Sequence, residues 1–218
     1  MRLKFAEQIA YSSKEAVRLT YELAVKCKYI QGVFVETGVA AGAQIIAMHN
    51  GAPYKMIYAF DSFEGIPLPS NRDNQMPGIK MLTETEQKCL PDPGKQALMS
   101  SGATVYTVAQ FMDNMIKGQV DTTKLVTVPG WFENTIPYYA SDIESIALLR
   151  LDGDLYYSTM VPLQHFFEKV RSGGYVIIDD WALPGCRAAC RDYFGSIQYE
   201  PDLQFLRGND FTIAYFKV

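Results

Sequence analysis

The feature that most constrains this chain is a repeated alternation between short β-rich runs and longer amphipathic stretches. Such alternation is typical of strands and helices that wind around a mostly parallel sheet. The last two runs are joined by the tight turn 208–210, so they are expected to pair antiparallel. The pattern predicts an α/β fold with a doubly wound, mostly parallel seven-stranded sheet. The expected strands cover residues 32–36, 55–60, 125–128, 143–151, 174–178, 203–207 and 211–217, and the expected helices cover residues 5–28, 43–49, 104–117, 159–171 and 184–194.

A single domain is expected over residues 1–218. The 48% hydrophobic content suffices for one core, and no repeat, linker or low-complexity tract interrupts the chain. Residues 1–30 are expected to form N-terminal helices, with Ser12 or Ser13 capping the second of them. Residues 62–102 hold five of the eleven prolines and few periodic apolar positions. We therefore expect this stretch to be an irregular lid or substrate loop with at most a short helix.

Charge and hydropathy narrow the range of partners. The net charge of -4 and the pI near 5.2 argue against a protein that holds nucleic acid or an anionic membrane through a basic surface. No uninterrupted apolar run approaches the roughly 20 residues needed to cross a bilayer, and the N-terminus lacks the apolar core of a signal peptide. We expect a cytoplasmic enzyme whose partners are small molecules or copies of itself, assembled as a homo-oligomer.

The cysteines predict packing rather than a disulfide framework. The four cysteines are few and scattered, so reduced thiols are expected. Cys186 and Cys190 share one face of an expected helix, where a zinc site would need His49 or His165 as further ligands. The favoured interpretation is that these two small side chains pack in the core.

The loop after the first expected strand has the composition of a nucleotide-type site. Gly38 and Gly42 follow the strand where the backbone must turn sharply and approach a ligand closely. Glu36 is expected to accept a hydrogen bond from a cationic amino group, and Thr37 lies beside it. The alternative is a tight strand-to-helix turn with no role in ligand binding.

The acid at the end of the second strand extends this site. Asp61 has the position from which a carboxylate binds both hydroxyls of an adenosine ribose, which fits NAD and S-adenosylmethionine alike. A dinucleotide site needs the glycine pattern G-x-G-x-x-G, but Ala40 stands two residues after Gly38. The loop therefore favours a methyl donor. Trp131, after the third strand, is expected either to wall in an adenine or to anchor the core or a lid.

Four acids follow the fourth and fifth expected strands. Asp152 and Asp154 end one run, and Asp179 and Asp180 end the next. If these strands are neighbours, the repulsion between the carboxylates requires a cation or bound protons. Oxygen ligands without nearby histidine suit Mg²⁺, with Ca²⁺ or Mn²⁺ as alternatives. The competing interpretation is that Asp154 caps the following helix and that Asp180 caps a turn.

Taken together, these motifs resemble the macrocin O-methyltransferase (TylF-like) family of class I S-adenosylmethionine-dependent methyltransferases, which methylate sugar hydroxyls on macrolide and aminocoumarin antibiotics. The resemblance covers nearly the whole chain from Gly32 onward. It rests on Glu36-Thr37-Gly38-Val39, Asp61-Ser62-Phe63-Glu64-Gly65-Ile66-Pro67, Gly130-Trp131-Phe132-Glu133-Asn134-Thr135-Ile136-Pro137, Leu151-Asp152-Gly153-Asp154-Leu155-Tyr156-Tyr157-Ser158-Thr159, Gly173-Gly174-Tyr175-Val176-Ile177-Ile178-Asp179-Asp180 and Pro184-Gly185-Cys186-Arg187.

The resemblance implies a Rossmann-like methyltransferase fold and assigns roles to the acids. Asp152, Asp179 and Asp180 match the metal ligands of the family, and Asp154 matches its proposed general base. The donor S-adenosylmethionine would be held by residues of the strand-end loops. These expected donor-binding residues are Glu36, Thr37, Gly38, Gly42, Asp61, Ser62, Trp131 and Asp152.

The expected function is metal-dependent transfer of a methyl group to a hydroxyl of a sugar or glycosylated small molecule. The ligand geometry also resembles catechol O-methyltransferase, which implies a vicinal diol as acceptor. Residues 70–100 do not match the family closely, so the identity of the acceptor does not carry over. The alternatives are a nicotinamide-dependent oxidoreductase and a module that binds the donor without turning it over.

Overall fold

A computed structural model describes residues 2–73 and 98–218, and its strands form one seven-stranded sheet in the order β3-β2-β1-β4-β5-β7-β6. The first five strands of the chain pair in parallel, and β7 pairs antiparallel with both β5 and β6. This arrangement confirms the predicted fold class. The strands are β1 (Val33–Thr37), β2 (Ile57–Asp61), β3 (Leu125–Pro129), β4 (Ile146–Leu151), β5 (Val170–Ile178), β6 (Gln204–Arg207) and β7 (Thr212–Lys217).

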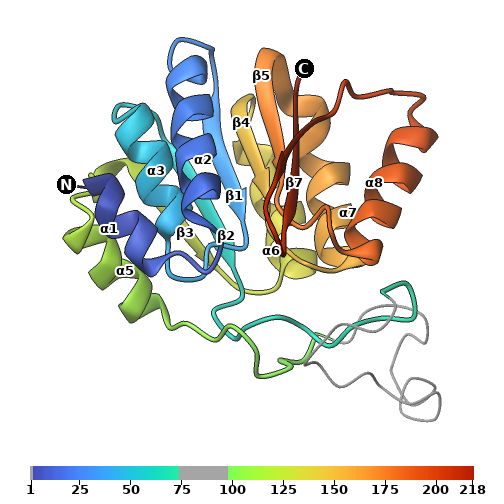
Figure 1. Cartoon of the computed structure of the whole chain (residues 1–218), viewed down its shortest axis with the longest axis horizontal. Coiled ribbons are helices and arrows are strands. Elements are labelled where there is room, and N and C mark those ends of the chain that lie inside the picture. The colour runs from blue at the N-terminus through green and yellow to red at the C-terminus, as the bar shows by residue number, and fades with distance from the viewer. Residues whose placement is uncertain (1, 74–97) are drawn as a thin grey trace.

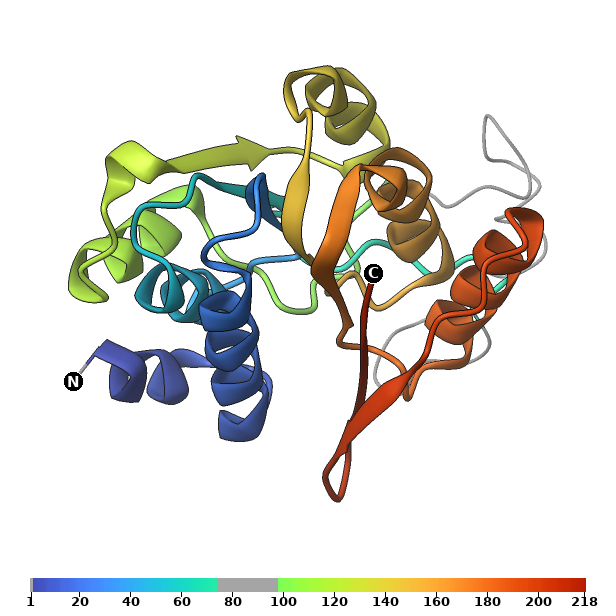
Figure 2. The ribbon, with the colours of Figure 1, turned by 90° about the horizontal axis from the view of Figure 1, so that it is seen from above.

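Helices cover both faces of the sheet, as Figures 1 and 2 show. One apolar cluster joins the sheet to α1, α2, α3 and α5, and a second joins it to α6, α7 and α8. No helix in the described part of the chain is long and apolar enough to cross a membrane. The helices are α1 (Arg2–Ile9), α2 (Lys14–Cys27), α3 (Ala43–Gly51), α5 (Val108–Lys117), α6 (Phe132–Tyr139), α7 (Tyr156–Phe166) and α8 (Pro184–Ser196), with short 3₁₀ turns at Thr122–Lys124, Ala140–Asp142 and Phe167–Lys169.

The central strand β4 is buried along its whole length. Burial of both faces is what gives a parallel strand a continuous apolar run rather than an alternating one. One side chain breaks the apolar run, because Arg150 lies fully buried near the carboxyl end of β4. Its partners belong to the functional site described below.

Several expected element boundaries were wrong. The helix expected over 104–117 begins at Val108, because Thr107 forms a capping box with Gln110. The strand expected over 143–151 begins at Ile146, after a 3₁₀ turn. The helix expected over 159–171 runs only from Tyr156 to Phe166, and Arg171 belongs to β5. Ser13 caps α2, as predicted.

Helix α6 was not expected at all. It spans only eight residues and contains Pro137, which normally argues against a helix interior because proline lacks an N–H. Phe132 and Ile136 nevertheless bury one side of this short helix against the sheet. Tertiary packing therefore forms a helix that the local pattern does not predict.

The described ends of the long loop cross the carboxyl edge of the sheet. Residues 62–73 run from β2 toward α7 and α8, and residues 98–107 return to α5 (Figure 1). The two segments are joined by backbone hydrogen bonds, with an isolated bridge between Pro67 and Ser100. The rest of the expected lid or substrate loop, with Cys89, lies outside the described residues.

Candidate active site

The carboxyl ends of β1 to β5 surround a cavity of about 280 Å³. Ligands of doubly wound sheets bind at this edge, near the point where the strand order reverses, here at β1 between β2 and β4. The structure brings eight of the predicted site residues into the cavity wall. They are Gly38, Asp61, Ser62, Trp131, Asp152, Asp154, Asp179 and Asp180. The described cavity lining does not include Glu36, Thr37 or Gly42.

The glycines of the first loop are required by packing. Gly38 has a φ of +90°, and a Cβ on it would lie 1.7 Å from the carbonyl oxygen of Asp152. Gly42 has a φ of +86°, and its Cβ would lie 2.2 Å from the Cε of Met115 on α5. Gly42 therefore fits the alternative of a tight strand-to-helix turn that binds no ligand. Gly38 both packs against the residue that follows β4 and lines the cavity.

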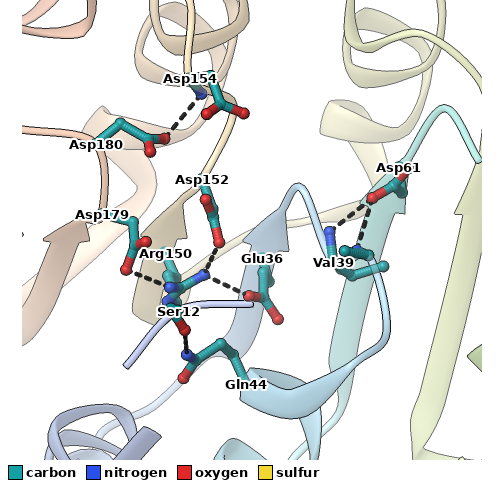
Figure 3. A network of polar contacts seen from close by, with 11 residues as sticks. Ser12, Glu36, Val39, Gln44, Asp61, Arg150, Asp152, Asp154, Asp179 and Asp180 are labelled. Atoms are coloured by element: carbon teal, nitrogen blue, oxygen red, sulfur yellow. Dashed lines mark hydrogen bonds and ion pairs between the residues drawn. The ribbon is translucent and has the colours of Figure 1, made fainter. Parts of the chain in front are cut away.

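Asp61 organises two loops at the end of β2. Its Oδ2 accepts hydrogen bonds from the N–H groups of Val39 (2.8 Å) and Ala40 (2.9 Å), and its Oδ1 accepts one from Phe63 (2.7 Å), as Figure 3 shows in part. Burial raises the pKa of Asp61, while these N–H groups oppose the rise. Each carboxylate oxygen offers about two lone pairs, so Asp61 keeps acceptor capacity toward the cavity.

The fully buried guanidinium of Arg150 joins Glu36 in β1 to the acids at the ends of β4 and β5 (Figure 3). Nη1 of Arg150 donates to Oε1 of Glu36 (2.7 Å) and to Oδ2 of Asp152 (2.5 Å). Nη2 of Arg150 donates to Oδ1 of Asp179. Glu36, expected to accept from a ligand amino group, therefore has one oxygen bound to Arg150. Its Oε2 is buried and has no hydrogen-bond partner within residues 2–73 and 98–218. Burial raises the pKa of Glu36 to about 8 despite the neighbouring guanidinium.

Three predicted metal ligands gather where β4 and β5 end. Carboxylate oxygens of Asp152, Asp179 and Asp180 lie within 4.8 Å of one another. Asp154 is beside them, with a φ of +63° and its backbone N–H donating to Oδ2 of Asp180 at 2.8 Å. Parallel pairing of β4 with β5 explains the convergence, because Leu151 lies opposite Ile178 in the register.

The interpretation of Asp154 as the cap of the following helix is wrong. Asp180 does begin a turn, because its carbonyl oxygen accepts from the N–H of Leu183 (2.8 Å). The residue at the N-cap of α7 is Leu155, and the residue at the N-cap of α8 is Leu183. The side chains of these two leucines make no capping hydrogen bond. The side chain of Asp180 instead accepts from the backbone of Asp154, which fixes the two acidic loops relative to each other.

The acids carry more negative charge than Arg150 neutralises. Burial is the first cause that raises the pKa of Asp154 to about 7 and that of Asp179 to about 7, and the neighbouring carboxylates raise them further. The pKa of Asp180 lies well above its ordinary value for the same reasons. Ionised carboxylates packed this closely are stabilised by a cation.

The cysteine pair belongs to the core. Cys186 and Cys190 are buried within the apolar cluster of α7 and α8. His49 lies in α3, where its Nε2 accepts a hydrogen bond from the N–H of Asp121. Over residues 2–73 and 98–218, the group with metal-ligand spacing is the aspartate triad. Packing of the two thiols, the favoured interpretation, is confirmed.

Other residues of the site were missed by sequence reasoning. Asp73 is buried, with Oδ1 accepting from the N–H of Tyr156 (2.5 Å) and Oδ2 accepting from the N–H and hydroxyl of Ser70. Ser12 lines the cavity and accepts from Gln44 (2.8 Å). Arg150 could have been found from the sequence, because an arginine inside an apolar strand is a buried charge that needs acidic partners. Asp73 and Ser12 carry no comparable signal.

The strand order defines a doubly wound, Rossmann-like fold, and the acids at the ends of β2, β4 and β5 line its cavity. The model of the macrocin O-methyltransferase (TylF) family matches residues 18–217, so the chain belongs to that family.

Two curated O-methyltransferases are similar in sequence to this chain. The chain is 31% identical over 171 residues to the 8-demethyl-8-(2,3-dimethoxy-alpha-L-rhamnosyl)-tetracenomycin-C 4'-O-methyltransferase of Streptomyces olivaceus, covering 76% of this chain and 59% of the relative. It is 30% identical over 169 residues to the mycinamicin III 3''-O-methyltransferase of Micromonospora griseorubida, covering 75% and 61%. The chain thus spans about three fifths of the length of these curated relatives.

Solved structures share the fold. The O-methyltransferase NovP superposes with a TM-score of 0.71 at 24% identity, over 94% of this chain and 80% of NovP. An O-methyltransferase from Bacillus cereus in complex with SAH gives a TM-score of 0.59 at 11% identity, over 100% of this chain and 90% of that one. These likenesses confirm the fold class.

Proposed function

We propose that this protein transfers a methyl group from S-adenosylmethionine to a hydroxyl of a sugar or glycosylated small molecule, with Mg²⁺ or another hard divalent cation. The observation that carries the proposal is one cavity whose wall contains both the Asp61 and Ser62 edge and the acids Asp152, Asp154, Asp179 and Asp180. The two curated relatives described above are named as O-methyltransferases, and the rhamnosyl part of the first name supports a sugar acceptor.

The residues present fit the methyl donor. Asp61 and Ser62 would hold the ribose, and Gly38 leaves the cavity wall without a side chain at the β1 turn. Glu36 is not among the cavity-lining residues, but its Oε2 lacks a partner in the described part of the chain, which supports a role near a cationic amino group. The donor carries its methyl group on a sulfonium, and the acceptor oxygen would bond to the methyl carbon as the carbon–sulfur bond breaks. S-adenosylhomocysteine would leave with the electron pair of that bond.

The residues also fit a hard cation. Asp152, Asp179 and Asp180 present oxygens within 4.8 Å of one another, and burial raises the pKa of the two acids from β5. Arg150 occupies one oxygen each of Asp152 and Asp179, which leaves their second oxygens for a ligand. When bound, a divalent cation would lower the pKa of the acceptor hydroxyl and orient it.

Asp154 would be the general base. Its carboxyl lines the cavity, and burial among Asp152 and Asp179 raises its pKa to about 7. A base with a pKa near the working pH is suited to removing a proton, so the Asp154 carboxylate would take the proton that leaves the acceptor hydroxyl. The contact between its backbone N–H and Asp180 holds it beside the triad.

The proposal extends to the location and assembly of the enzyme. A cytoplasmic location is supported by the reduced thiols expected from the sequence. A homo-oligomer is supported by exposed apolar side chains such as those of Tyr11, Ile116 and Tyr138. A vicinal diol on the acceptor would suit a cation held by the triad.

Incubation with S-adenosylmethionine, Mg²⁺ and a panel of glycosides, followed by mass spectrometry, tests the proposal. We expect a mass increase of one methylene on a sugar acceptor and its loss in the presence of EDTA. Parallel calorimetry with S-adenosylhomocysteine and NAD separates methyl transfer from the oxidoreductase alternative. Tight donor binding with no methylated product over the panel would favour the binding-module alternative.

A further inference from the structure

Glu133 is a cavity-lining residue with one unsatisfied carboxylate oxygen. It is the second residue of α6, it lines the cavity, and its Oε1 is buried without a hydrogen-bond partner among the described residues. Burial is the first cause that raises its pKa, and its own backbone N–H opposes the rise only in part. An acceptor left unpaired in this way is costly, so a ligand that brings an N–H group to it gains free energy.

A purely structural role explains only part of this arrangement. A carboxylate in the first turn of a helix interacts favourably with the helix dipole, and the N–H of Glu133 itself lowers the carboxyl pKa. Glu15 occupies the same kind of first-turn position in α2 but is exposed to water. The helix dipole therefore accounts for an acid at this position, but it does not account for the burial of Oε1 in a cavity wall.

The sheet order places Glu133 on one side of the donor site. The loop after β3 is tied to the end of β2 by the hydrogen bond from the N–H of Gly130 to the carbonyl oxygen of Asp61 (2.8 Å). The aspartate triad lies on the other side, because β1 and β4 separate β2 from β5. If the ribose sits at Asp61 and the methyl group points toward the triad, the base must extend toward the β3 loop.

We infer that Glu133 accepts a hydrogen bond from the exocyclic amino group of the adenine of the methyl donor, and so selects adenine over other purines. This inference rests on the proposed function. The ribose hydroxyls belong to the Asp61 edge, and the amino-acid part lies toward β4, so the adenine amino group is the remaining N–H donor on this side. An ionised carboxylate is acceptor-only, and it would repel the carbonyl oxygen that hypoxanthine carries in place of the amino group.

The test compares the affinity of two probes for three proteins by calorimetry. The probes are S-adenosylhomocysteine and its hypoxanthine counterpart S-inosylhomocysteine, and the proteins are the wild type, Glu133→Gln and the matched first-turn control Glu15→Gln. The measurements use about pH 8, well above the ordinary glutamate pKa of about 4.3. Thermal unfolding of each protein confirms that the variants are folded.

The wild type and Glu15→Gln should prefer the adenine probe by about 10- to 100-fold, the effect of a hydrogen bond to a charged group. Glu133→Gln should bind the two probes within about 3-fold of each other, because an amide can accept from the amino group or donate to the carbonyl. Equal affinities in the wild type, or an unchanged preference in Glu133→Gln, would overturn the inference while the donor assignment stands. Failure of the wild type to bind either probe would overturn both.

Discussion

Arg150→Met removes the buried guanidinium that pairs with Glu36, Asp152 and Asp179. Arg150 is fully buried and Glu36 is 1% exposed, so water cannot replace the lost contacts without opening the core. Loss of one partner from a buried ion network costs about 3–5 kcal/mol, because the remaining charges stay buried. A domain of this size is typically stable by about 5–15 kcal/mol, so the variant should lose a large part of its stability.

The loss should depend on pH in a defined direction. Burial raises the folded-state pKa of Asp179 to about 7 and that of Glu36 to about 8, and Arg150 opposes both shifts. Removal of Arg150 raises these pKa values further. An acid with a raised folded pKa contributes stability below its unfolded pKa of about 4, and that contribution is lost as the pH rises through the folded pKa. The difference between variant and wild type should therefore be larger at about pH 8 than at about pH 5.

Urea unfolding followed by circular dichroism, with EDTA present to remove metal, measures both effects. Arg18→Met is the matched control, because Arg18 pairs with Glu7 at 2.8 Å but its side chain is 57% exposed. Exposed ion pairs contribute little, so the urea midpoint of this control should stay close to that of the wild type. A loss below about 1 kcal/mol for Arg150→Met at about pH 8, or a larger loss at about pH 5, would refute the reasoning.

Three further predictions concern the site. Asp154→Asn should lower turnover, measured as initial rates, by about 10²- to 10⁴-fold while the affinity for S-adenosylhomocysteine stays nearly unchanged. Wild-type turnover should rise with pH through about 7 as Asp154 ionises. An unchanged turnover in the variant would rule out Asp154 as the base. EDTA should abolish methyl transfer and added Mg²⁺ should restore it, and persistent activity in EDTA would contradict a metal at Asp152 and its neighbours. Gly38→Ala should lower the unfolding temperature by several degrees, because the added Cβ clashes with the carbonyl oxygen of Asp152. The control is Gly195→Ala in α8, where an added Cβ meets no atom within 4 Å. Equal unfolding temperatures for the two variants would disprove the packing argument.

The local sequence pattern was sufficient to predict the sheet and the edge that carries the site. Alternation of runs predicts parallel strands, and parallel strands bring their carboxyl ends to one edge, so Asp61, Asp152 and Asp179 were predictable as neighbours of one cavity. Local pattern was less informative for α6, where Pro137 argues against a helix that tertiary packing stabilises. Element ends such as the start of β5 depend on pairing partners that local periodicity does not contain.

The pairing of the charges depends on contacts that form only in the folded chain. Arg150 meets Glu36 because β1 lies between β2 and β4 and the register places these two residues opposite each other. Residues 114 positions apart in sequence thereby share a hydrogen bond, and Glu36 contributes to the charge balance of Asp152 and Asp179. The identity and order of the acids can be seen in the sequence. The raised pKa values of Asp154, Asp179 and Asp180 arise from burial and strand pairing, which exist only in the folded molecule.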